Sequence, residues 1–110
     1  MKLEAVFIAA DQPAEAAAFL TGGLGLPDAE SGDEGQVAFS GLGTFVALEP
    51  VESGSHAGAV TLWFRVDDAV RQTETLLEQG ADLVQAPASA GGETVAVVLT
   101  PHGVRIGLIS

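Results

Sequence analysis

Cysteine and histidine, two residue types that commonly carry out catalysis or bind metals, are scarce in this sequence of 110 residues. Cysteine is absent, which removes disulfides, thiolate catalysis and cysteine-based zinc sites together. The two histidines, His56 and His102, fall in a connector and in a hairpin turn, where we expect no ligand-binding role. The single tryptophan, Trp63, and the arginines Arg65 and Arg105 have more to offer a ligand, because each stands in a strand-like segment.

The charge balance is strongly acidic, with fifteen Asp and Glu against four Lys and Arg and a net charge of −11. The negative electrostatic field of such a chain repels phosphate backbones and anionic membranes, so we expect neither a nucleic-acid nor a membrane partner. The apolar run between Glu4 and Asp11 is too short and too acidic for a secretory signal. The length predicts one domain, and we expect it to be cytoplasmic.

The first half of the chain predicts a strand, a helix and three further strands. We expect Asp11 to cap the helix, with Pro13 in its first turn, and Gly22-Gly23 to end it. The acidic segment 28–34 predicts a short edge strand and a solvated loop, with steering of a cationic ligand as the alternative role of its charges. The other predicted elements are a strand at 3–10 and a hairpin of 36–40 and 44–49 around Gly41–Gly43.

The second half repeats this order. Asp67 or Asp68 is expected to cap a helix that runs to about Gln79, and Gly80 to end it. The apolar stripe of this helix is predicted to be Ala69, Val70, Thr73, Leu76 and Leu77. The predicted strands are 59–66, an edge strand at 81–87, and a hairpin of 93–100 and 104–110 around Pro101-His102-Gly103, with Gly91-Gly92 in a loop.

The two halves therefore predict an internal duplication. A shift of 57 residues places Glu4 on Thr61, and a shift of 60 residues places Leu48 on Leu108. We expect one domain, residues 1–110, made of two βαβββ modules at about 1–52 and 58–110, joined by a flexible Gly/Ser connector at 51–58. Each module is too small to bury its own sheet, so the two are expected to pack together.

The order and spacing of three fragments resemble the vicinal-oxygen-chelate superfamily, which includes glyoxalase I, bleomycin-resistance proteins and extradiol dioxygenases. The resemblance covers nearly the whole chain and implies an α+β fold in which two βαβββ modules pair into a cupped mixed sheet. The fragments are Phe19-Leu20 with Leu24-Gly25-Leu26; Val66-Asp67-Asp68 with Leu77, Gly80-Ala81 and Pro87; and the segment from Thr100 to Leu108, with Thr100 where the family usually has Asp.

The metal positions of the family's enzymes are changed in this chain. The resemblance places those four positions at Glu4, Ala47, Thr61 and Gly107. A catalytic divalent site needs about three protein ligands of suitable type, and one carboxylate with one hydroxyl does not supply them. We therefore predict no metal and no other cofactor.

Strand alternation then predicts which residues share a face with these four positions. Their face mixes aromatic, acidic and basic side chains, whereas the opposite face is apolar, as expected beneath a helix. The predicted cup face consists of Glu4, Val6, Ile8, Phe45, Ala47, Glu49, Thr61, Trp63, Arg65, Arg105, Gly107 and Ile109. The predicted helix face consists of Leu3, Ala5, Phe7, Thr44, Val46, Leu48, Val60, Leu62, Phe64, Val66, Val104, Ile106 and Leu108.

Six residues of the cup face form the predicted ligand-binding site. Trp63 and Phe45 could stack on a planar ligand, with Trp63 packing between modules or subunits as the alternative. Arg65 and Arg105 could accept a carboxylate, phenolate or quinone oxygen. Glu4 and Glu49 could bind a ligand cation, or pair with the arginines in purely structural ion pairs.

Among the family's members, metal-free bleomycin-resistance-like proteins sequester bulky natural products, usually in a cleft formed with a second subunit. The resemblance therefore implies a homodimeric binder of an aromatic or cationic small molecule, an antibiotic being one candidate, with no catalytic residue. The first alternative is an enzyme of the same fold: a lyase, isomerase or dioxygenase. It would use an unorthodox metal site, or Glu4 as general base with Arg65 or Arg105 stabilising an oxyanion.

Two other interpretations remain open. One is a structural or partner-binding domain whose cup is filled by another chain. The other is a different duplicated architecture, a ferredoxin-like βαββαβ fold, which leaves one strand of each module unexplained.

Overall fold

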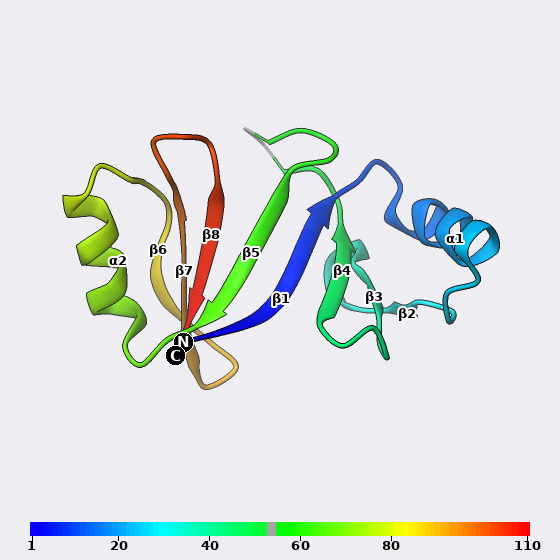
Figure 1. The fold of residues 1–110 in the computed structure, drawn as a ribbon, viewed down its shortest axis with the longest axis horizontal. Helices are drawn as coiled ribbons and strands as arrows, with labels where there is room; N and C mark the ends of the chain where they lie inside the picture. Colours follow the sequence, from blue (N-terminus) through cyan, green and yellow to red (C-terminus); the bar gives the residue numbers. More distant parts are fainter. Residues whose placement is uncertain (53–54) are drawn as a thin grey trace. The chain divides into compact units, whose positions relative to one another are not determined.

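The structure is a computed structural model that describes residues 1–52 and 55–110 (Figure 1). The described chain forms two compact units: unit 1 consists of Met1–Glu4 and Thr61–Ser110, and unit 2 of Ala5–Val60. The predicted α+β class and the order strand, helix and three strands, occurring twice, are confirmed. Residues 53–54 of the predicted connector lie outside the described residues.

Unit 2 contains a small mixed sheet with one helix. Its strands lie in the order β2-β3-β4-β1, with β1 and β4 parallel and the other neighbouring pairs antiparallel. The acidic segment forms a two-residue edge strand, as predicted, and a short exposed 3-10 turn where a loop was predicted. The elements are β1 (Lys2–Ala9, whose first residues belong to unit 1), α1 (Pro13–Leu24), β2 (Glu30–Ser31), the turn Asp33–Gly35, β3 (Val37–Phe39) and β4 (Phe45–Glu49).

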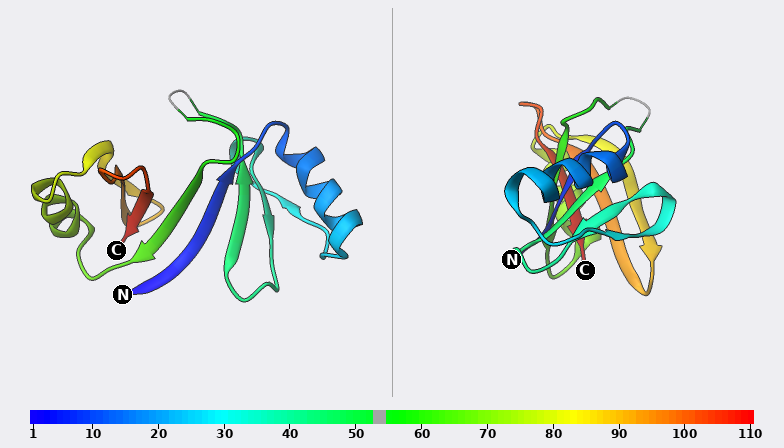
Figure 2. Two further views of the ribbon diagram at one scale, coloured as in Figure 1. Left: turned by 45° about the horizontal axis from the view of Figure 1, so that its top comes forward. Right: turned by 90° about the vertical axis from the view of Figure 1, so that its right-hand side faces the viewer.

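Helix α1 packs on the sheet of unit 2 over β3 and β4 (Figure 2). The buried residues of this core are Ala17 from the helix, Val37 and Phe39 from β3, and Leu48 from β4. Ile8 of β1 also packs against them. Because the side chains of α1 in this core are mostly alanines, the larger residues of the strands fill most of its volume.

Both predicted ends of α1 are wrong by a few residues. Gln12, not Asp11, is the N-cap residue, and it makes no side-chain capping bond because its backbone is left-handed, with φ of 49°. Pro13 begins the helix, as predicted. The helix runs through the Gly22-Gly23 pair and ends at Gly25, whose φ of 72° is the left-handed conformation that glycine adopts at no steric cost.

Unit 1 contains the second mixed sheet and helix (Figure 1). Its strands lie in the order β5-β8-β7-β6, with β5 and β8 parallel and the other neighbouring pairs antiparallel. Strand β6 is longer than the predicted edge strand and reaches the Gly91-Gly92 turn. The elements are β5 (Val60–Arg65), α2 (Ala69–Glu78), β6 (Asp82–Ala90), β7 (Glu93–Leu99) and β8 (Arg105–Ile109).

Helix α2 packs mainly on β7, with further contacts to β6 and β8. Its predicted cap is confirmed, because the Asp68 carboxylate accepts a hydrogen bond from the Arg71 backbone N–H at 3.1 Å. Ala69 and Thr73 of the predicted stripe are buried. Val70 and Leu77 are 45% and 37% exposed, so the contact stripe is narrower than predicted.

The core of unit 1 lies between α2 and the sheet. Val66, Ala69 and Leu108 are buried there, and Phe64, Leu76 and Ile106 pack against them.

Neither helix in the described residues, 1–52 and 55–110, has the length and apolar character needed to span a membrane.

Candidate functional site

The strand register of unit 1 places the chemically richest residues on one side of its sheet. Thr61 pairs with Arg105 and Trp63 with Gly107 across β5 and β8, and paired residues project to the same side. The intervening Phe64, Ile106 and Leu108 pack toward α2, so this side of the sheet is the one away from the helix. We call it the Trp63 face; it is formed by Thr61, Trp63, Arg65, Val95, Val97, Leu99, Arg105, Gly107 and Ile109.

Trp63 lies directly over Gly107 at the centre of this face. A Cβ atom at position 107 would overlap three atoms of the indole, so only glycine leaves room for the ring. Val97 of β7 is paired with Gly107 on its other side and is only 4% exposed, so it is a buried apolar neighbour of this part of the sheet. The side chain of Trp63 is partly exposed, and its Nε1 atom is buried. The arrangement presents an aromatic ring held against the sheet at a position without a side chain.

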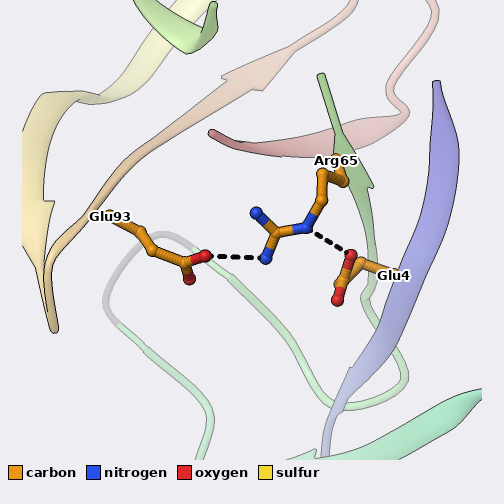
Figure 3. A network of polar contacts seen from close by, with 3 residues as sticks. All are labelled: Glu4, Arg65 and Glu93. Atoms are coloured by element: carbon orange, nitrogen blue, oxygen red, sulfur yellow. Dashed lines mark hydrogen bonds and ion pairs between the residues drawn. The ribbon is translucent and has the colours of Figure 1, made fainter. Parts of the chain in front are cut away.

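Arg65, at the end of β5, is held by two carboxylates from different strands (Figure 3). Its Nε donates to Glu4 Oε2 of β1 at 2.9 Å, and its Nη2 lies 2.8 Å from Glu93 Oε1 of β7. The hydrogen bond to Glu4, and then that to Glu93, raise the pKa of Arg65 above its ordinary value. Because all three side chains are between 35% and 40% exposed, water screens these ion pairs considerably. The three groups together carry a charge of −1.

Arg105, at the start of β8, is in a different environment. Its Nε donates to the hydroxyl of Thr61 at 3.2 Å, and Thr61 itself is only 5% exposed. Within residues 1–52 and 55–110, no carboxylate forms an ion pair with Arg105. A guanidinium carries five N–H donors in a planar fork, so four remain for an anionic group. Of the two arginines, Arg105 is therefore the better placed to bind one.

Glu93 is a member of this site that the sequence analysis missed. The predicted cup face takes its members from β1, β4, β5 and β8, where the family's metal positions lie, and none from β7. The sequence does contain a pattern that could have identified Glu93. Along β7, Glu93, Val95, Val97 and Leu99 form one of the two alternating sets of side chains. The hairpin with β8 places this set on the same side as Arg105.

The structure places the other two predicted residues, Phe45 and Glu49, at the two ends of β4 in unit 2. Phe45 is 45% exposed, and its ring centroid lies 6.1 Å from that of Phe7, with the rings tilted by 42°. Glu49 is half-buried and borders an acidic groove of about 190 Å³ that Asp33 and Glu34 also line. The four residues Glu4, Trp63, Arg65 and Arg105 belong to unit 1.

The predicted orientation of β1 is wrong from Ala5 onward, whereas Glu4 contacts Arg65 of the Trp63 face. The register of β1 pairs Ala5 with Phe45 and Ile8 with Leu48, so Ile8 projects toward α1 and into the helix-packed core. Phe7 projects to the other side, where its ring meets that of Phe45. From Ala5 to Ala9, apolar residues occupy both alternating sets of β1, and burial therefore does not distinguish the two faces of this segment in the sequence. The prediction for β4 is correct, since Leu48 is in the core.

Two larger grooves lie on the helix sides of the units. A groove of about 450 Å³ in unit 2 lies between α1 and the β2 edge, and its lining is mostly alanine and glycine with Asp28 as the one charged residue. A groove of about 380 Å³ in unit 1 lies at the start of α2. Neither includes any of the six predicted site residues. The residues that line these two grooves do not combine an aromatic ring with charged groups, as those of the Trp63 face do.

The carboxylates of the described residues do not form a metal site. Within residues 1–52 and 55–110, no three His, Asp or Glu side chains lie close enough together to hold a metal ion. Glu4, which stands at one metal position of the family's enzymes, is instead bonded to Arg65. What this site can offer a ligand is an aromatic surface, hydrogen-bond donors and carboxylate oxygens.

Solved structures share this fold over almost the whole chain. A glyoxalase/bleomycin resistance protein/dioxygenase superfamily member from Vibrio splendidus has a TM-score of 0.69 at 22% identity, covering 98% of this chain and 97% of its own. An NAD-dependent benzaldehyde dehydrogenase from Legionella pneumophila also has a TM-score of 0.69, at 15% identity, with 96% of each chain covered. A Streptomyces coelicolor methylmalonyl-CoA epimerase, in complex with 2-nitronate-propionyl-CoA, has a TM-score of 0.63 at 15% identity, covering 99% of this chain and 96% of its own.

These identities are low, so the likeness is one of fold. No curated protein matches the sequence. The family model described as the glyoxalase-like domain matches residues 5–109, which is nearly the whole chain. The chain therefore belongs to the glyoxalase-like domain family.

Proposed function

We propose that this protein binds and sequesters an aromatic or cationic natural product without a metal, in the manner of bleomycin-resistance proteins. The observation that carries the proposal is the Trp63 face, where a partly exposed indole is held over Gly107 between charged side chains at both ends. A protein surface that served only for packing or only for solvation would not combine these groups. A largely apolar surface with a few polar anchors is typical of small-molecule sites.

The polar groups of this face favour binding over turnover. Glu4, the carboxylate that would act as general base in an enzyme of this fold, is engaged with Arg65, as is Glu93. A general base must be within hydrogen-bond reach of the proton it removes, and Arg65 holds Glu4 through one of its two carboxylate oxygens. We infer that these carboxylates position Arg65 and contribute negative potential, without transferring a proton.

The first test is a binding measurement with Trp63 as reporter. Because Trp63 is the only tryptophan, a ligand that stacks on it is expected to quench or shift the tryptophan fluorescence. We expect at least one member of a panel of aromatic natural products, including cationic antibiotics, to do so. If the whole panel leaves the emission unchanged, the stacking proposal is wrong.

A second measurement separates sequestration from catalysis. The bound compound, released by denaturation and analysed by mass spectrometry, is expected to have an unchanged mass. Conversion of a hemithioacetal or a catechol, or a stoichiometric transition metal in the purified protein, would support the enzyme alternative instead. Native mass spectrometry of the same sample tests the homodimer that the family resemblance implies.

A substitution tests the role of the ring. Trp63→Leu is expected to lower the affinity roughly threefold to tenfold, because it removes the aromatic contact and keeps an apolar side chain. Trp63→Phe should retain most of the affinity, and calorimetry measures both variants without the fluorescent reporter. Equal affinities for the leucine variant and the unaltered protein would leave Trp63 a packing residue.

A further inference from the structure

The polar groups of the Trp63 face, together with the two carboxylates that contact Arg65, are divided into two ends of opposite charge. At one end, Glu4 and Glu93 both contact Arg65, each through one carboxylate oxygen, which leaves one oxygen of each carboxylate for another donor (Figure 3). Two carboxylates on one guanidinium give this end a charge of −1. Arg65 neutralises only one of the two carboxylates, so the net negative charge of this end attracts a cation.

At the other end, Arg105 provides a positive charge that no carboxylate of the described residues neutralises. Its Nε is fixed by the Thr61 hydroxyl, which orients the guanidinium plane. The two terminal nitrogens of such a fork match the two oxygens of a carboxylate. This end therefore attracts an anion.

The strand register gives the spacing between the two ends. Thr61 and Arg105 form one rung of the β5–β8 pair, and Arg65 and Ile109 form another, four residues further along β5. At about 3.3 Å per residue the two rungs are about 13 Å apart. Trp63 and Gly107 form the rung midway between them, so the aromatic surface lies between the two charged ends.

We propose that the ligand of this face is amphoteric: a planar aromatic molecule with an anionic group bound by Arg105 and a cationic group bound at Glu4 and Glu93. The inference rests on the proposed function and specifies the charges and length of the ligand. It also explains why the strong acidity of the chain is not repeated on this face, where Glu4 and Glu93 are balanced by Arg65 and Arg105.

Three biphenyl probes test the charge pattern by calorimetry. They are 4′-(aminomethyl)biphenyl-4-carboxylate, which carries both charges, biphenyl-4-carboxylate, and 4-(aminomethyl)biphenyl. Since each partly exposed ion pair contributes modestly, we expect the first probe to bind at least about fivefold more tightly than either of the others. Equal affinities for all three probes would overturn the charge assignment.

Variants assign each charge to its end. Arg105→Gln is expected to weaken the amphoteric and the anionic probe about fivefold and to leave the cationic probe unchanged. Glu93→Gln is expected to weaken the amphoteric and the cationic probe only. The matched controls are Arg71→Gln and Glu74→Gln, which make the same charge changes on α2, away from this face, and should alter no affinity.

The failure of this inference and that of the proposed function give different results. If natural products quench Trp63 but the biphenyls bind without regard to charge, or not at all, the charge pattern is wrong and the aromatic site stands. If neither the biphenyls nor the natural-product panel binds, both proposals are wrong.

Discussion

The parallel strand pairs of the two units, β1–β4 and β5–β8, occupy equivalent places in the repeated order of elements but differ in register. In unit 1 the register pairs Thr61 with Arg105. The shifts that align the two halves, 57 and 60 residues, would place Glu4 opposite Phe45 in unit 2. Unit 2 instead pairs Ala5 with Phe45, a displacement of one residue.

A displacement of one residue exchanges the two faces of a strand. In unit 1 the alignment partner of Phe7, Phe64, packs toward the helix, whereas Phe7 projects to the opposite side and meets Phe45. The helix sides of β4 and β8 remain equivalent, since Leu48 and Leu108 both lie in helix-packed cores. The duplication is thus retained in the order of elements and in the β4 and β8 core positions, and is lost on the other side of the sheets.

The loss of equivalence has a chemical consequence. At the aligned positions 47 and 107, unit 2 has a buried alanine and unit 1 a glycine covered by Trp63. At the aligned positions 45 and 105, unit 2 has an exposed phenylalanine and unit 1 an arginine held by Thr61. The comparison teaches that similar cores can carry different surfaces, and that the polar anchors described here belong to unit 1.

The largest expected effect tests the helix-packed cores, which are equivalent in the two units. Leu48→Ala and Leu108→Ala each remove a side chain that is at most 4% exposed, so each should lower the free energy of unfolding by about 2–5 kcal/mol. Urea unfolding followed by circular dichroism measures both. Val70→Ala, at a 45% exposed position of α2, is the control and should change it by less than about 0.5 kcal/mol. A loss below about 1 kcal/mol in either leucine variant would contradict the equivalence of the cores.

The second-largest effect tests the sides of the sheets away from the helices, which differ between the two units. Gly107→Ala places a methyl group into the volume of the Trp63 ring, and such overpacking typically costs about 1–3 kcal/mol. The displaced ring should also change the tryptophan emission. Its matched partner is Ala47→Gly, which removes a methyl group at the aligned position and should cost only about 0.5–1 kcal/mol.

A double variant shows whether the cost at position 107 comes from the ring. Adding Trp63→Leu to Gly107→Ala should recover part of the lost stability, because the two changes act on one contact and are therefore not additive. Additive costs, or a Gly107→Ala variant as stable as the unaltered protein with the same emission, would show that Trp63 does not depend on glycine at this position.

The parts of the site that could be predicted from the sequence are those where the two alternating sets of a strand differ in chemistry. In β5, Leu62 and Phe64 alternate with Trp63 and Arg65, so only one orientation buries the apolar set, and the prediction is correct. In the part of β1 that belongs to unit 2, Val6 and Ile8 alternate with Ala5 and Phe7, and neither pair is polar. Pairing with β4 decides between them, and sequence alternation carries no information about that pairing.

The partners of the two arginines required knowledge of which strands are neighbours. An ion pair between Arg65 and Glu4 is one of the predicted alternatives. The second partner, Glu93, comes from β7, which contributes no residue to the predicted cup face. Thr61 was predicted to share a face with Arg105, and the structure adds the hydrogen bond between them. Residue types and alternation thus predicted most members of this face, whereas the division between a bound and an available arginine depends on tertiary contacts.

The smallest expected effect concerns the starts of the two helices, where the aligned residues Asp11 and Asp68 behave differently. Asp68 accepts a hydrogen bond from the Arg71 backbone N–H, so Asp68→Ala should cost about 1 kcal/mol, and Asp68→Asn should cost little because asparagine is an equally good cap. Asp11 is exposed and precedes the left-handed Gln12, which is the N-cap residue. Asp11→Ala should therefore change stability by less than about 0.5 kcal/mol.

Amide hydrogen exchange adds a local measurement to this comparison. The Arg71 amide should lose protection in Asp68→Ala, because the carboxylate that accepts its hydrogen bond is removed, and should keep it in Asp68→Asn. No amide at the start of α1 should respond to Asp11→Ala, since this helix begins without a side-chain cap. Equal effects of the two alanine substitutions would mean that both helices are capped alike, and that unit 1 and unit 2 differ only on the sides of their sheets away from the helices.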